Sequence, residues 1–107
     1  MQKYYQVWIS AENQEQADKI LNTLLEKKLV TGGQFIKAPA RFWWKGEIVD
    51  MDYVSITSFT TEDKKDAIIK VTNEVSVEEV PMIQFYQFES NEELTNWIDK
   101  TLKNTQH

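Results

Sequence analysis

Polar and hydrophobic residues alternate near the start of the chain, along residues 4 to 10. Tyr5, Val7 and Ile9 fall on one side of this segment if it is extended, because successive side chains of a strand point to opposite faces. We therefore predict a first strand that buries this side against a core.

The next segment has the period of an amphipathic helix, with apolar residues recurring from Ala17 to Leu29. Asn13 and Gln16 stand at the spacing of a capping box, which predicts that the helix begins there. The glycine pair at residues 32 and 33 is expected to end the helix immediately before the pair or earlier.

Two long extended runs follow, at residues 34 to 44 and 47 to 60. Lys45 and Gly46 lie between them and predict a tight hairpin turn. Pro39 lacks a backbone donor, so it belongs at a bulge or on an edge strand. Both runs exceed the usual strand length of about five or six residues, so we expect the hairpin to project beyond its sheet.

The rest of the chain predicts a helix at residues 61 to 73, a strand at residues 80 to 88 and a last helix. Thr60 and Asp63 stand at cap spacing before the second helix, and the run SNEE at residues 90 to 93 opens the third. The third helix is expected to bury Leu94, Trp97, Ile98 and Leu102.

The predicted order of elements, βαββαβα, is that of an α+β fold. We expect a ferredoxin-like βαββαβ sandwich with an extended hairpin between the second and third strands and an additional C-terminal helix. One domain should span residues 1–107. One face of such a sheet carries no crossover helix, and here it would present Tyr4 and Trp8. An exposed aromatic face favours self-association.

The hairpin segment RFWWKGEIV places Phe42, Trp43 and Trp44 in succession. On a strand, Trp43 must point away from its two neighbours, so both faces of the hairpin need cover. Aromatic residues on a hairpin pack in interfaces more often than they bind ligands. The candidate residues of a self-association interface are Tyr4, Trp8, Trp43 and Trp44.

Composition narrows the range of partners. The net charge of −5 and the pI near 4.8 give little attraction for a nucleic-acid backbone or an anionic membrane, so we expect neither partner. The chain has no cysteine and one histidine, at its C-terminal end, so the usual nucleophile arrangements are incomplete. We predict a protein without enzymatic activity or cofactor.

The sequence also predicts a cytoplasmic location. No apolar run approaches the length of a membrane span, and the start MQKYYQ lacks the features of a signal peptide.

Two other classes share the predicted topology. An RNA-recognition domain would stack bases on Tyr4 and Trp8, but its third strand should carry a basic-Gly-aromatic signature, and this one reads DYVSITSF. An acylphosphatase-like enzyme would need an arginine in an anion-binding loop after the first strand, where this chain reads SAENQE. Both classes are disfavoured.

The run EKKLVTGGQFIKAPARFWWKGEIVDMDYVSITSFTTED resembles the CutA divalent-cation tolerance family, with its leucine-rich first helix and its aromatic-x-W-K-G hairpin. The later segments EEVPMIQF and NEELTNWIDKTL are similar to the Glu-Val-Pro segment and the final helix of the family. The resemblance implies a homotrimer, similar in architecture to PII signalling proteins, in which long hairpins reach onto neighbouring subunits. It also implies a non-enzymatic role in divalent-cation tolerance.

The departures from the family concern metal binding. Gly32 and Ser76 stand where relatives often have Cys and His, and the single histidine is His107. Copper selects soft thiolate and imidazole ligands, so we expect no tight copper site and assign no metal ligands. We expect Cu²⁺ or Zn²⁺ to bind weakly, mainly through exposed carboxylates or His107. The alternative to a small-ligand or metal-responsive protein is a structural or protein-interaction trimer with no metal role.

The candidate ligand cleft consists of Trp44, Lys45 and Glu79, two on the hairpin and one before the fourth strand. Carboxylates could instead bind a hard cation, but such clusters are more often solvated or capping. The acidic residues considered for that role are Asp50, Asp52, Glu62, Asp63, Glu78 and Glu79.

Overall fold

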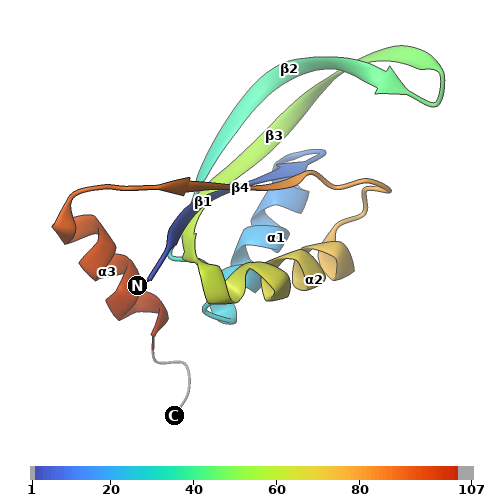
Figure 1. Ribbon diagram of the computed structural model, residues 1–107. Helices are drawn as coiled ribbons and strands as arrows, with labels where there is room; N and C mark the ends of the chain where they lie inside the picture. Colours follow the sequence, from blue (N-terminus) through green and yellow to red (C-terminus); the bar gives the residue numbers. More distant parts are fainter. Residues whose placement is uncertain (1, 104–107) are drawn as a thin grey trace.

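The computed structural model describes residues 2–103 (Figure 1). In chain order, its elements are β1 (Tyr4–Ala11), α1 (Gln14–Glu26), β2 (Gln34–Trp44), β3 (Glu47–Thr61), the short 3₁₀ helix η1 (Glu62–Lys64), α2 (Lys65–Val75), β4 (Ile83–Phe88) and α3 (Glu92–Leu102). None of these helices combines the length and apolar character needed to cross a membrane.

The four strands form one antiparallel sheet in the order β2-β3-β1-β4. Helices α1 and α2 cover one face of the sheet, and the core lies between these helices and the sheet (Figure 1). Val7 and Ile9 of β1 are buried there with Ile20 and Leu24 of α1. The alternation that predicted β1 therefore selects the core face correctly, and the predicted ferredoxin-like arrangement is confirmed.

The second face of the sheet is partly covered by α3. The hydroxyl of Tyr4 donates to Asp99 at 2.7 Å, and the indole nitrogen of Trp8 donates to Gln6 at 3.0 Å. Both aromatic side chains are half-buried rather than exposed. Trp97 was predicted to be buried, but 47% of its surface is exposed, because Ile98 and Leu102 form the buried side of α3.

Helix α1 ends at Glu26, before the glycine pair, as predicted. The N–H of Lys28 donates to the carbonyl of Leu25 and that of Leu29 to the carbonyl of Leu24, both at 3.0 Å. This is the hydrogen-bond pattern of a Schellman motif, with Lys28 in the left-handed conformation (φ 57°) that glycine usually occupies. Gly33 has a different role, since a Cβ there would lie 2.8 Å from the Leu21 side chain.

Other predicted boundaries shift by one to three residues. Asn13 caps α1 as predicted, accepting from the backbone N–H of Gln16 at 2.9 Å. The N-cap residue of η1, which leads into α2, is Thr61 rather than Thr60, and its side chain makes no capping hydrogen bond. The buried hydroxyl of Thr60 instead donates to the carbonyl of Leu29. The fourth strand begins at Ile83 rather than residue 80, and Asn91 stands at the N-cap position of α3 without a side-chain capping bond.

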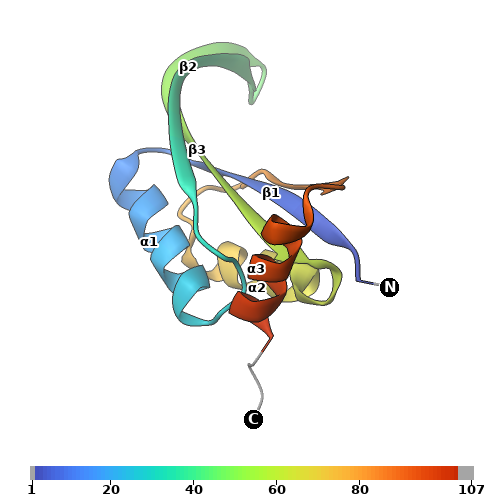
Figure 2. The same cartoon turned by 90° about the vertical axis from the view of Figure 1, so that its left-hand side faces the viewer.

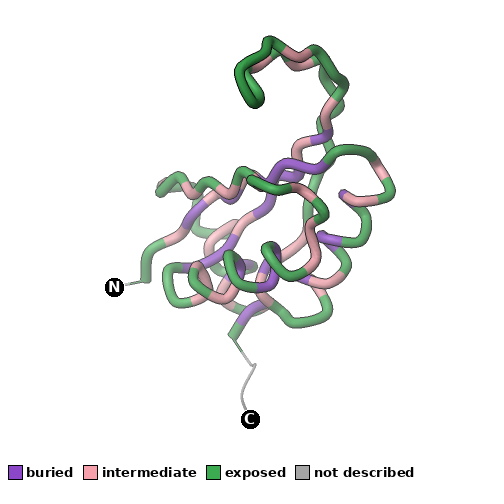
Figure 3. Tube along the Cα trace, turned by 90° about the vertical axis from the view of Figure 1, so that its right-hand side faces the viewer, coloured by how far each residue is buried: buried purple, intermediate pink, exposed green. Residues whose placement is uncertain are grey.

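Strands β2 and β3 extend beyond the rest of the sheet as a two-stranded arm. Pairing of β1 with β3 stops at Ala11 opposite Val54, so residues 38–44 and 47–53 pair only with each other. Figures 2 and 3 show this arm rising from the sheet and curling over at its tip, with most of it exposed. The predicted projecting hairpin is therefore present.

The turn at the tip of the arm fixes its register. Lys45 and Gly46 both have positive φ, 49° and 83°, as a type I′ turn requires. Trp43 consequently lies opposite Ile48, on the face that continues the helix-covered side of the sheet. Phe42 and Trp44 lie on the other face, as the alternation predicts.

The left-handed Lys28 leads to a test of stability. A side chain in this conformation costs about 1 kcal/mol or more relative to glycine. Lys28→Gly should therefore raise the free energy of unfolding by about 1 kcal/mol, measured by chemical denaturation at a fixed protein concentration. Lys27→Gly is the matched control and should give no gain, because Lys27 already has φ −91°. A Lys28→Gly chain no more stable than the parent would contradict the assignment.

Candidate functional site

A cavity of about 150 Å³ lies beneath the arm, between its inner face and the segment that joins α2 to β4. Its walls are aromatic and apolar, and carboxylates lie around it. The lining residues are Glu12, Phe42, Trp44, Val49, Met51, Tyr53, Glu78, Glu79 and Val80. The curl of the arm brings residues from distant parts of the chain to this one place.

An ion pair joins the tip of the arm to the body of the protein. The Nζ of Lys45 lies 3.2 Å from Glu79 Oε1 and 5.4 Å from the centre of the Trp44 ring. Both charged side chains are mostly exposed, so the pair contributes little stability by itself. Its geometry nevertheless places the three residues that the sequence suggested for a ligand cleft side by side.

The second connection lies at the root of the arm and is more buried. Glu78 Oε1 accepts from the hydroxyl of Ser10 at 3.0 Å and from that of Tyr53 at 3.1 Å. The Ser10 hydroxyl also accepts from the backbone N–H of Met82 at 2.9 Å. Glu78 therefore links β1, β3 and the segment before β4.

The Glu78 carboxylate is incompletely satisfied. Its Oε2 is buried and has no hydrogen-bond partner among the described residues. Burial raises the pKa of Glu78, and the nearby charge of Glu12 adds to this rise, while the hydroxyls of Ser10 and Tyr53 oppose it. Burial, together with the charge and hydrogen bond of Glu78, raises the pKa of Tyr53 to about 12, so Tyr53 remains a donor at neutral pH.

The two adjacent tryptophans of the arm face different surroundings. Trp44 lines the cavity and is 38% exposed, whereas Trp43 points outward on the opposite face and is 71% exposed. Its cross-strand neighbour Ile48 is 60% exposed. Of the four residues predicted for an interface, only Trp43 is thus largely open, since Tyr4 and Trp8 are half-buried on the other sheet face.

Sequence reasoning did not include Ser10, Glu12 or Tyr53 in the cleft. For Tyr53 a signal exists, because a two-residue turn at residues 45 and 46 places it on the same face as Phe42 and Trp44. No local pattern pairs Ser10 with Glu78, because these residues meet only through the tertiary fold.

Of the carboxylates considered for a hard cation, Glu78 and Glu79 share the cavity beneath the arm, while others lie elsewhere. Asp50 pairs with Arg41 at 2.6 Å on the outer face of the arm, while Glu62 accepts from the Tyr5 hydroxyl at 2.6 Å. Among residues 2–103, no three His, Cys, Asp or Glu side chains are grouped so as to hold a metal ion. His107 lies outside the described residues.

Gly32 and Ser76, which stand where relatives often have Cys and His, make local hydrogen bonds here. The Ser76 hydroxyl accepts from the N–H of Glu78 at 3.1 Å, and the carbonyl of Gly32 accepts from the hydroxyl of Ser58. Ser76 thereby shapes the turn that presents Glu78 to the cavity.

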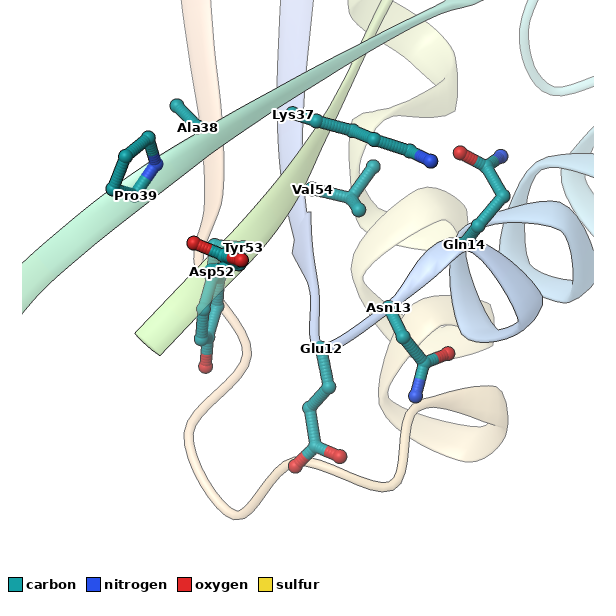
Figure 4. A pocket seen from close by; sticks show the side chains of 9 residues that line it. All are labelled: Glu12, Asn13, Gln14, Lys37, Ala38, Pro39, Asp52, Tyr53 and Val54. Atoms are coloured by element: carbon teal, nitrogen blue, oxygen red, sulfur yellow. The ribbon is translucent and has the colours of Figure 1, made fainter. Parts of the chain in front are cut away.

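A second hollow, of about 390 Å³, lies at the root of the arm (Figure 4). Figure 4 shows Lys37 reaching from β2 toward Gln14 at the start of α1. Glu12 and Tyr53 point away from Lys37 in this view. The hollow is wider and more mixed in charge than the cavity beneath the arm, and none of the residues predicted for the cleft lines it.

Comparison with known proteins identifies related sequences along nearly the whole chain. The family model described as CutA1 divalent ion tolerance protein matches residues 5–101. The Divalent-cation tolerance protein CutA of Thermotoga maritima is 31% identical over 98 residues, covering 90% of this chain and 96% of the relative. The protein of the same description from Thermococcus kodakarensis is 27% identical over 97 residues, covering 90% and 93%.

Solved structures show the same fold. The periplasmic divalent cation tolerance protein CutA of Archaeoglobus fulgidus superposes with a TM-score of 0.89 at 26% identity, covering 94% of this chain and 99% of its own. CutA1 of Oryza sativa gives a TM-score of 0.90 at 15% identity, covering 96% of each chain, which bears on the fold alone.

The raised pKa of Glu78 predicts how stability depends on pH. The folded chain binds the proton of the Glu78 carboxyl group more tightly than the unfolded chain does. Glu78 therefore adds to the stability of the fold below its ordinary pKa of 4.5. This contribution to stability is lost as the pH rises through the raised pKa of the folded chain. Glu78→Gln removes the titration, so the free energy of unfolding of this variant relative to the parent should increase as the pH rises from below 4.5 through the raised pKa of Glu78.

Denaturant titrations at several pH values test this expectation. Tyr53→Phe removes a donor that holds the Glu78 pKa down, so it should make the pH dependence of the parent steeper. A difference between Glu78→Gln and the parent that stays constant with pH, or falls as the pH rises, would contradict the assignment.

Proposed function

Because the chain belongs to the CutA1 divalent ion tolerance family, we propose that it acts in divalent-cation tolerance as a non-enzymatic homotrimer that binds a small ligand beneath its arm. The arm carries this proposal. Its outer face has an exposed apolar pair at the tip, Trp43 and Ile48, and its inner face forms a cavity with charged groups.

The outer face supports self-association. A two-stranded ribbon has no core of its own, so its apolar side chains are covered only by another surface. Trp43 and Ile48 face each other across the strands at the tip and are the most exposed pair of large apolar residues on the arm. A neighbouring subunit would remove this pair from water, and two such side chains contribute about 2 to 5 kcal/mol when fully buried.

The inner face supports ligand binding at the cleft of Trp44, Lys45 and Glu79. These residues adjoin a cavity whose walls combine aromatic rings with carboxylates, as small-molecule sites commonly do. The register therefore suggests different roles for the two adjacent tryptophans: Trp43 lies in the subunit interface and Trp44 lies in the ligand cleft. Both assignments are part of this proposal.

A cytoplasmic location is part of this proposal. The Archaeoglobus fulgidus protein is described as periplasmic, whereas the sequence predicts a cytoplasmic location here. Fractionation of the cells that produce the protein, followed by immunodetection, distinguishes the two compartments.

Assembly is tested by sedimentation. The parent chain should sediment as a trimer at micromolar subunit concentration. Replacing Trp43 and Ile48 together by Ser should shift it to smaller species, because the apolar cover of the arm is lost. Ile69→Ser is the matched control, since Ile69 is an exposed isoleucine (39%) on α2, away from the arm. A stable parent monomer, or a double variant that remains fully trimeric, would refute the proposed role of this pair.

Metal binding is tested by calorimetry. Since the described residues offer no grouped ligands, Cu²⁺ and Zn²⁺ should bind weakly, and removing His107 should abolish most of the heat observed. A tight site with one metal per subunit that persists in the truncated chain would contradict this and would point to the carboxylates around Glu78 and Glu79.

A further inference from the structure

The cavity beneath the arm is acidic. Among residues 2–103, the nine that line it include Glu12, Glu78 and Glu79 but no Lys or Arg. Glu78 has no cationic partner among the described residues: both hydroxyl donors bind its Oε1, and its buried Oε2 has no hydrogen-bond partner there. A positive charge inside the cavity would be attracted by all three carboxylates.

The walls of the cavity also favour a cation. Phe42, Trp44 and Tyr53 line it, and the rings of Phe42 and Tyr53 meet edge to face with centroids 5.8 Å apart. Aromatic rings attract cations through the negative potential of their faces, and Trp does so most strongly. Met51 and Val49 add apolar, polarizable surface between the rings.

The protein already holds one ammonium group in this way. Lys45 places its Nζ near the Trp44 ring and pairs with Glu79, at the rim of the cavity. Its side chain is 66% exposed, and it makes no ion pair with Glu78 or Glu12 in the described part of the chain. The tethered ammonium thus shows the mode of binding while leaving the inner carboxylate uncompensated.

The geometry favours an organic cation over a metal ion. A bare divalent cation needs several oxygen ligands in direct contact, and the described carboxylates are not grouped for that purpose. Glu78 Oε2 has almost no exposed surface, so Glu78 acts on an occupant through its charge rather than through a hydrogen bond. An alkylated ammonium suits these conditions, because its methyl groups contact the rings while its charge is felt across the cavity.

Size sets the last limit. An apolar protein cavity of ~150 Å³ accommodates a molecule of the size of benzene. The cavity beneath the arm has about the same volume, so a compact cation with few carbon atoms fits within it.

We propose that the cavity beneath the arm is a binding site for a small alkylammonium cation, held between the ring of Trp44 and the carboxylates of Glu78 and Glu79. The ammonium group of Lys45, at the rim of the cavity, competes with this ligand for the Trp44 ring and Glu79. This inference rests on the ligand cleft of the proposed function and names the chemical class of its ligand.

Calorimetric titration of the purified full chain with tetramethylammonium chloride tests the inference. Tert-butanol, which is neutral and similar in size and shape, serves as the matched probe, and sodium chloride controls for ionic strength. Saturable binding of tetramethylammonium, without saturable binding of tert-butanol, is the expected result. Equal binding of both probes, or no saturable binding of tetramethylammonium, overturns the proposed ligand class.

Variants identify the site. Trp44→Leu should weaken tetramethylammonium binding about tenfold, since the cation–π contact is lost. Glu78→Gln and Glu79→Gln should each weaken it several-fold. Lys45→Met should tighten it, because this change frees the Trp44 ring and Glu79. Glu26→Gln removes one exposed charge from the end of α1 and should leave binding unchanged. Weaker binding by Lys45→Met overturns the role of Lys45 as a competitor.

Folding and assembly are measured in the same samples. Circular dichroism and sedimentation show whether each variant keeps the parent fold and size. Trp44→Phe retains an aromatic face and should recover part of the affinity that Trp44→Leu loses, so the assignment remains testable if Trp44→Leu misfolds. A folded Trp44→Leu chain that binds as tightly as the parent overturns the site.

The outcomes separate this inference from the proposed function. If the parent is trimeric and tert-butanol binds at Trp44 as well as tetramethylammonium does, the ammonium class is wrong while the ligand cleft stands. If neither probe binds and the parent is monomeric, the proposed function fails as well.

Discussion

Register within the β2–β3 ribbon is the constraint on which the rest of the structure depends. A two-residue turn with positive φ at Lys45 and Gly46 allows one pairing of the two strands, and that pairing assigns every side chain of the arm to a face. A slip by one residue would exchange Trp43 with Trp44. The outward tryptophan would then enter the acidic cavity, and the inward one would be exposed.

The inner face of the arm depends on a second connection, made by Glu78. This residue accepts from Ser10 of β1 and from Tyr53 at the point where the arm leaves the sheet. Two hydroxyl donors on one oxygen position the arm without neutralising the carboxylate. The contacts that anchor the ribbon therefore leave a negative charge in the cavity beneath it. Lys45 offsets negative charge only at the rim of the cavity, through its ion pair with Glu79.

Much of the fold follows from local pattern. The alternation around Val7 and Ile9 identifies the core face of β1, and Asn13 caps α1 through the bond that its spacing suggests. The left-handed conformation of Lys28 was not predicted, because a non-glycine residue in this conformation leaves no mark in the sequence. The predicted burial of Trp97 was wrong, because the buried side of α3 is set by which face of the sheet the helix meets. For the candidate site, the sequence predicted a cleft of Trp44, Lys45 and Glu79, and the structure brings these three residues together. Ser10 and Glu12 were not predicted, because the curl of the arm and the course of the segment before β4 decide what meets there.

The thinness of the arm has a consequence for how its two faces communicate. Only one layer of backbone separates Trp43 from Trp44, and the ribbon has no core that could absorb a displacement. Any movement of the tip therefore repositions both surfaces together. By thermodynamic linkage, an occupant of the inner face that shifts the ribbon changes the affinity of whatever covers the outer face, and the reverse effect has the same magnitude. For the proposed trimer, ligand occupancy beneath the arm and assembly on its outer face would then be coupled through the ribbon.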